Sequence, residues 1–172
     1  MEVINMARAM DVADEIITLA HGKANPVSNL KLQKMMYFLN ALSLVQSGHP
    51  LVDDGQMFEK WDYGPVIHSV YSEYSVFGAS PILSPLEHQN IVFDDKGFPE
   101  LQISIFNQRE FEENNGDADF IVDNIDDFLN FRASQLVTES HREPQWRDRS
   151  IREYSNNLTR IFYSDPINQF WR

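Results

Sequence analysis

Cysteine is absent from the 172 residues of this chain. Without thiols, the chain can form neither a disulfide framework nor a zinc site with thiolate ligands. The residues from Met1 to Asn5 show no basic segment followed by an apolar run, so we expect no secretory signal. Polar residues interrupt every apolar stretch well before a membrane-spanning length, and we expect a cytoplasmic protein that does not contact membranes.

Positive charge is scarce. The chain has 14 Lys and Arg against 26 Asp and Glu, which gives a formal net charge of −12. Such a field repels nucleic acid and anionic lipid and attracts cationic partners. Eight of the acids lie between Glu110 and Phe131, where there is no base. This acidic stretch is either a solvated face or a docking surface for a basic protein.

Motifs that carry catalysis or bind cofactors are also missing. The chain has 7 Gly and contains no phosphate-binding G-x-G-x-x-G or Walker loop, no H-E-x-x-H and no G-x-S-x-G. No two of the five His are four residues apart, the spacing that would place two ligands on one helix face. We therefore expect no metal and no cofactor, and no enzyme. A metal-dependent hydrolase using Asp62, His68 and His141 is the third of three hypotheses.

Hydrophobic residues make up 42% of the chain and aromatic residues 12%, which is enough for one domain with an aromatic-rich core. Apolar periodicity predicts helices over about 6–21, 29–47, 65–77, 119–129 and 133–139, and a last one after a cap at Ser150. Ser28 is placed to cap the second helix. That helix is apolar nearly all round, so we expect it to be buried at the centre of the fold.

Two segments favour β-structure. A short strand fits within 56–62, directly before the Gly64-Pro65 break, and a hairpin fits 91–106. Alternation of Leu101, Ile103 and Ile105 predicts that one face of the hairpin is buried. The fold class is therefore mainly α (α+β): a compact helical domain around a buried central helix, with one short strand and one small hairpin.

The aromatic segment from Trp61 to Pro65 has two interpretations. Trp and Tyr combine a large apolar area with a polar group, which suits both cores and interfaces. We expect Trp61 to lie in the core, and Tyr63 either to do the same or to contact a partner. His141 is either a functional residue or a structural one that binds a backbone carbonyl.

Three segments together resemble the Panacea domain family, also called the SocA-like or phage-associated family. They are SNLKLQKMMYF at 28–38, FEKWDYGPVIHSVY at 58–71 and LVTESHREPQW at 136–146. The resemblance covers about residues 10–165 and implies one domain over 1–172. Ser140 replaces the Thr that precedes the family's His. The region 89–131, which includes the acidic stretch, is longer than expected, and it either selects a particular toxin or is a lineage-specific hairpin.

The resemblance implies that the chain is the antitoxin of a bacterial or phage toxin–antitoxin pair. In that family the domain neutralises protein toxins by direct binding. The alternative is a proteolytic adaptor that delivers its toxin to a Clp-type protease. The acidic charge favours a basic toxin, and a homo-oligomer is left open. The motif residues either form the scaffold or build a shared partner-binding surface: Lys31, Gln33, Lys34, Tyr37, Trp61, Tyr63, Gly64, Pro65, His68, Tyr71, His141 and Trp146.

Overall fold

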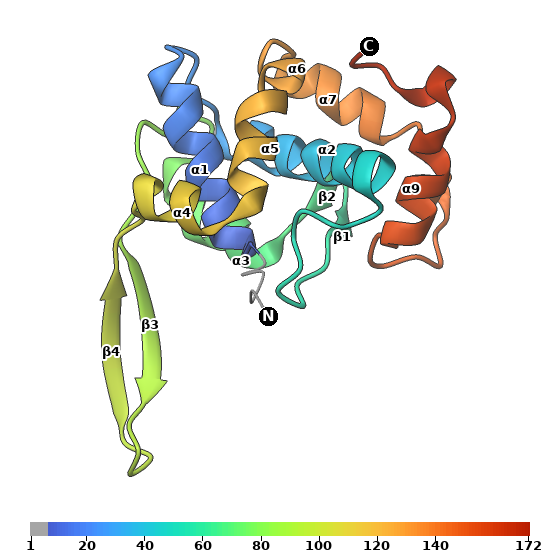
Figure 1. The fold of residues 1–172 in the computed structure, drawn as a ribbon. Coiled ribbons are helices and arrows are strands. Elements are labelled where there is room, and N and C mark those ends of the chain that lie inside the picture. The colour runs from blue at the N-terminus through green and yellow to red at the C-terminus, as the bar shows by residue number, and fades with distance from the viewer. Residues whose placement is uncertain (1–6) are drawn as a thin grey trace.

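The computed structural model describes residues 7–172. Helix α1 spans Ala9–Gly22 and helix α2 spans Asn29–Ser47. The first helix therefore begins later than predicted, and the part of the prediction at residue 6 lies outside the described residues. Figure 1 shows α2 running through the middle of the body, with the other helices around it. No helix within 7–172 is both long and apolar enough to cross a membrane.

Helix α2 is the buried centre that the sequence predicts. The Ser28 side chain caps it by accepting a hydrogen bond from the Lys31 amide, and Gly48 ends it with a left-handed φ of 77°. Every residue from Leu32 to Leu44 is buried. The helices that contact it include α1, α3, α5 (Gly116–Asn124), α6 (Asp126–Leu129), α7 (Ala133–Ser140) and α9 (Asn156–Ser164); α3 spans His68–Tyr74.

The predicted short strand is β1 (Glu59–Trp61), and it pairs with a strand that the sequence did not predict, β2 (Gly64–Val66). The prediction that Pro65 begins a helix is therefore wrong. Pro65 lies opposite Lys60 in β2, whose other side pairs with no strand among residues 7–172, so a missing amide is tolerated there; the other side of β1 forms a bridge to Glu153. The third helix, α3 (His68–Tyr74), begins later and continues into a 3-10 turn, η1 (Ser75–Phe77).

Several boundaries in the second half of the chain differ from the predictions. The helix predicted over 119–129 is two helices, α5 and α6, separated at Ile125. Two short helices, α4 (Gln108–Asn114) and α8 (Pro144–Arg147), were not predicted. Ser150 does not cap the last helix, because Ser155 accepts the hydrogen bond from the Leu158 amide and α9 begins at Asn156. A 3-10 turn, η2 (Pro166–Asn168), follows.

The predicted hairpin is confirmed as the antiparallel pair β3 (His88–Phe93) and β4 (Pro99–Ser104). It projects away from the helical body (Figure 1). The prediction that one face is buried is wrong: Leu101 is 62% exposed, Ile103 55% and Ile105 71%. The alternation is that of a strand with one apolar face, but the hairpin extends beyond the body that would cover it.

A buried carboxyl group ties the C-terminal part of the chain to α2. Glu143 is fully buried and accepts hydrogen bonds from the Tyr37 hydroxyl at 2.7 Å and the Tyr163 hydroxyl at 2.8 Å. The Gln145 amide donates to it at 3.3 Å and to Thr159 at 3.0 Å. Burial raises the pKa of Glu143 to about 7, although these donors favour the ionised form.

This network predicts a pH dependence. The folded pKa of Glu143 is about 7 and its ordinary value is 4.5. Between those values the folded state binds the proton more tightly, so stability falls as pH rises. The loss reaches about 3 kcal/mol by the conversion of about 1.4 kcal/mol per pKa unit. Glu143→Gln removes the titration, so the difference in unfolding free energy between variant and wild type should change by that order from pH 4.5 to 7.5.

Urea unfolding at several pH values measures this difference. Glu153→Gln, at an exposed carboxyl group, controls for the loss of one negative charge. A wild-type-minus-variant difference that stays constant with pH would contradict the assignment.

Candidate functional site

The first two motifs meet where α2 satisfies the backbone of the β1–β2 hairpin. The Lys34 ammonium donates to the Pro65 carbonyl oxygen at 2.8 Å, and the Gln33 side-chain oxygen accepts from the Ile67 amide at 3.0 Å. Both side chains are fully buried. Burial lowers the pKa of Lys34 to about 7, because a charged ammonium loses its hydration there. These residues fix the position of the strand rather than contact solvent.

Neighbouring polar residues extend this bracing. The Gln33 amide donates to Asn29 at 3.2 Å, and the Asn29 amide donates to the Tyr71 carbonyl oxygen at 3.0 Å. Lys31 reaches a different element and donates to the Leu129 carbonyl oxygen at the end of α6, at 2.5 Å. Side chains of helix α2 thus contact α3 and α6 by donating to one backbone carbonyl of each.

The third motif packs against the same turn. The rings of His141 and Trp146 stack with centroids 3.7 Å apart, and the Trp146 indole donates to the Trp61 carbonyl oxygen at 3.4 Å. Burial lowers the pKa of His141 despite a hydrogen bond to the backbone of Asp62. His141 is therefore half-buried against the turn. Its Nε2 is buried, with no hydrogen-bond partner among residues 7–172.

Gly64 lies where the three motifs pack most closely against one another. Its φ is +92°, and a Cβ added there would lie 2.3 Å from Ser140 Oγ and 3.1 Å from Lys34 Cε. Distances this short require movement of the surrounding atoms. One residue from each of the three motifs therefore meets at this position, and a glycine is needed both for the left-handed backbone and for the space.

Four motif residues reach the surface above this scaffold, and we call them the turn surface: Trp61, Tyr63, His68 and Tyr71. Tyr63 is 67% exposed at the turn between the two strands. Trp61 is half-buried against Tyr71, with ring centroids 4.9 Å apart, and lies edge-on to exposed His68 at 5.7 Å. Glu59 accepts from the Trp61 indole at 2.8 Å and lies 3.6 Å from His68.

Nine of the twelve motif residues thus divide into two groups, and the other three, Lys31, His141 and Trp146, are half-buried. Gln33, Lys34, Tyr37, Gly64 and Pro65 are buried, and we call them the scaffold residues. Among residues 7–172, no three His, Asp or Glu side chains are grouped so that they could hold a metal ion. The structure therefore does not assemble Asp62, His68 and His141 into a metal site.

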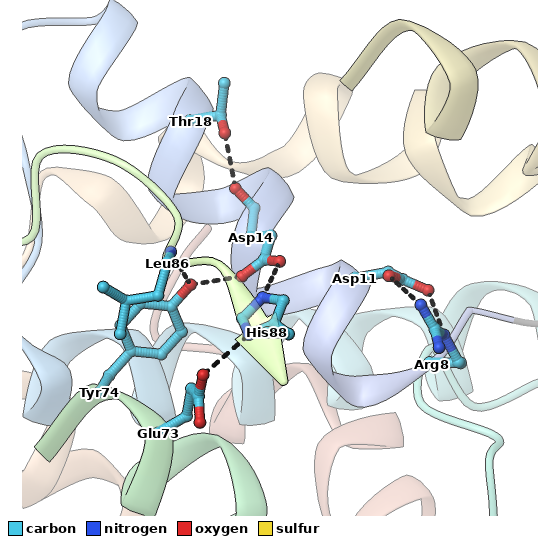
Figure 2. Close-up of polar contacts among 8 residues, drawn as sticks. All are labelled: Arg8, Asp11, Asp14, Thr18, Glu73, Tyr74, Leu86 and His88. Carbon is cyan, nitrogen blue, oxygen red and sulfur yellow. Dashed lines mark hydrogen bonds and ion pairs between the residues drawn. The ribbon is translucent and has the colours of Figure 1, made fainter. Parts of the chain in front are cut away.

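A polar cluster at the root of the β3–β4 hairpin was not predicted (Figure 2). His88, the first residue of β3, lies between two carboxylates: Nε2 is 2.6 Å from Asp14 and Nδ1 is 3.0 Å from Glu73. The Tyr74 hydroxyl donates to the other Asp14 oxygen at 2.5 Å. We call Asp14, Glu73, Tyr74 and His88 the root cluster. It joins α1, α3 and the hairpin.

The charged forms of His88 and the two carboxylates in the root cluster stabilise one another. Burial raises the pKa of Asp14, which is 1% exposed, against the opposing hydrogen bonds from Tyr74 and His88. Burial would lower the pKa of His88, but hydrogen bonds and charges from Glu73 and Asp14 outweigh it and raise the pKa. One sequence signal existed, namely that Asp14 falls within the apolar stripe of α1 between Ala13 and Ile17. Its partners are distant in sequence and could not be identified.

A cavity of about 810 Å³ opens beside the root cluster. Its lining includes Asp11, Asp14 and Glu110 together with apolar Ile105 and Phe106. Arg8 also lines it and forms an ion pair with Asp11 at 2.8 Å. The cavity therefore combines acidic and apolar walls at the point where the hairpin leaves the body.

Gly64 offers a sharp stability test, because Gly55 supplies a matched control. Gly55 also has a positive φ, of 81°, but an added Cβ there has no described atom within 4 Å. Both changes to Ala introduce left-handed strain of about 1–2 kcal/mol. Only Gly64→Ala also forces apart Ser140 and Lys34, so we expect it to lose about 1–3 kcal/mol more. Equal losses for both variants in denaturant unfolding would rule out the close-packing role.

The comparisons with known proteins agree with the three motifs. The profile of the family described as antitoxin SocA-like, Panacea domain matches residues 32–147. The chain is similar to the protein named antitoxin SocA from Caulobacter vibrioides, strain NA1000 / CB15N, with 40% identity over 76 residues. That alignment covers 44% of this chain and 39% of the relative, so the chain matches well under half of the relative's length. No solved structure matches.

The matched residues include most of α2 and all of β1 and β2. They also include His141 and Trp146, which pack on the turn. They cover more than half of the chain. The chain belongs to the antitoxin SocA-like, Panacea domain family.

Proposed function

We propose that this protein is an antitoxin that neutralises a cognate protein toxin by binding it directly. The observation that carries the proposal is membership of the family, whose motif residues here build one braced turn. The scaffold residues hold that turn from below, and the turn surface lies above it. A fixed aromatic surface suits protein recognition, because aromatic anchors contribute much of the energy in interfaces.

Negative charge supports the kind of partner we propose. The net charge is −12, and many exposed carboxylates lie on α4 and α5. A field of this sign accelerates the approach of a basic protein and disfavours nucleic acid. We therefore propose a basic toxin, held by the turn surface after electrostatic encounter, with the toxin's active site covered in the complex.

The turn surface is tested at its two most exposed residues. Tyr63→Ala and His68→Ala should each weaken binding of the toxin encoded beside this gene by at least about tenfold, the effect of losing an interface anchor. Ile167→Ala, at a position 79% exposed, is the control and should bind like wild type. Calorimetry gives the dissociation constants, and growth rescue on co-expression gives the biological readout. Unchanged affinity for both turn variants would exclude this surface.

Co-expression also separates neutralisation from proteolytic delivery. A direct neutraliser restores growth in cells that lack the Clp-type protease, and the toxin accumulates there as a complex. Rescue that disappears with the protease, together with a toxin level that falls only when the protease is present, would instead identify an adaptor.

Salt tests the electrostatic part of the proposal. The association rate should fall by about tenfold or more between about 50 and 500 mM NaCl, because ions screen the field over shorter distances as salt rises. The dissociation rate should change much less. Stopped-flow mixing measures both rates, and an association rate independent of salt would contradict steering by charge.

A further inference from the structure

The β3–β4 hairpin has one apolar face and one polar face. Residues paired across the strands share a face, and successive residues alternate. The pairs Gln89–Ile103, Ile91–Leu101 and Phe93–Pro99 therefore lie on one side, and Asn90–Gln102 and Val92–Glu100 on the other. We call the side formed by Ile91, Phe93, Leu101 and Ile103 the apolar face.

The apolar face is exposed to solvent. Ile91 is 68% exposed, Phe93 70%, Leu101 62% and Ile103 55%. A lone exposed apolar residue is ordinary, but four large ones gathered on one face typically mark an interaction surface. Two strands alone are also only marginally stable in water. Covering this face would both remove apolar area from water and stabilise the hairpin.

The hairpin is anchored at its root, and its turn is closed by hydrogen bonds within the tip. At its root, His88 is held between Asp14 and Glu73, as Figure 2 shows. At its tip, one Asp94 side-chain oxygen accepts from the amides of Lys96 and Phe98 at 2.9 and 2.8 Å. An element fixed in this way loses less conformational freedom on binding than a flexible loop would. The root contacts thus fix where the hairpin leaves the body.

Charge decides between a second copy of this chain and a different protein. The hairpin carries Asp94, Asp95 and Glu100 against Lys96, and the cavity at its root is lined by Asp11, Asp14 and Glu110 against Arg8. A second copy would bring the same acids and the same net charge of −12 against them. Like charges brought together oppose binding, whereas basic side chains beside an apolar strip would satisfy both the acids and the exposed face.

We propose that the apolar face of the β3–β4 hairpin is the surface that selects the toxin, and that this toxin presents an apolar strip flanked by basic side chains. The inference rests on the proposed function and adds a second contact to the turn surface. The turn surface is built by the family motifs, whereas the hairpin lies in the long region between the second and third motifs. The scaffold therefore seats the toxin, and the hairpin distinguishes one toxin from another.

The test compares two cross-strand pairs of one hairpin. Ile91→Thr with Leu101→Thr changes a pair on the apolar face, and Asn90→Thr with Gln102→Thr changes the neighbouring pair on the polar face. Thr favours strands, so both variants should keep the hairpin. Binding of the toxin encoded by the adjacent gene should weaken by at least about tenfold for the first variant and by less than about twofold for the second.

Each outcome has one meaning. Equal affinity of the wild type and both variants would overturn the role of the apolar face while leaving the proposed function intact. No binding by the wild type would refute the proposed function itself, and with it the basis of this inference. A wild-type dimer in analytical ultracentrifugation that dissociates in the Ile91/Leu101 variant would overturn the choice of partner and assign the face to a second copy. Far-UV circular dichroism shows whether each variant keeps the fold.

Discussion

Two buried side chains of α2 hydrogen-bond to the backbone of the β1–β2 segment, and most of the candidate site depends on these bonds. Gln33 accepts from the Ile67 amide, and Lys34 donates to the Pro65 carbonyl oxygen. A two-stranded sheet of three-residue strands is too small to hold its own position. Side chains from a central helix compensate by satisfying backbone groups that the sheet leaves unpaired. The lysine is well suited to this task, because its long chain spans apolar surroundings and ends in a donor.

Burial makes this bracing sensitive to every atom around it. Lys34 loses hydration, and its lowered pKa of about 7 reports the penalty. Gly64 leaves room for Ser140 directly beside the lysine, and the stacked pair of His141 and Trp146 packs against the neighbouring backbone. The three motifs are therefore separate in sequence but form one packed unit. Together they fix the turn between β1 and β2, and the side chain of Tyr63 at the tip of this turn remains exposed to solvent.

Local patterns predicted the elements that are determined locally. Ser28 and the all-round apolar surface of α2 predicted a capped, buried helix, and alternation in 91–106 predicted a hairpin. The same patterns gave wrong predictions where contacts between distant parts of the chain determine the local structure or its burial. Pro65 looked like a helix start, but its carbonyl bond to Lys34 and its pairing with Lys60 place it in a strand. Alternation in Leu101 and Ile103 indicated an apolar face correctly, yet nothing local could tell that the face lies beyond the body.

The candidate site was predicted as a set of motif residues, without the distinction between bracing and surface. That distinction follows from which way each side chain points after α2 is enclosed, and sequence spacing alone does not supply it. The root cluster was missed for a similar reason. Asp14 in an apolar stripe signalled an unusual carboxylate, but His88 and Glu73 reach it only through the packing of α1 against α3 and the path of the chain into β3.

The projection of the β3–β4 hairpin also has an evolutionary consequence. Its apolar side chains contact little of the helical body, so replacing them changes the free energy of unfolding far less than replacing a residue of α2 would. Mutations can therefore accumulate along the hairpin without endangering the scaffold. On the proposed assignment of the hairpin, a change of partner needs substitutions at only a few exposed positions, while the braced turn and its buried lysine stay as they are.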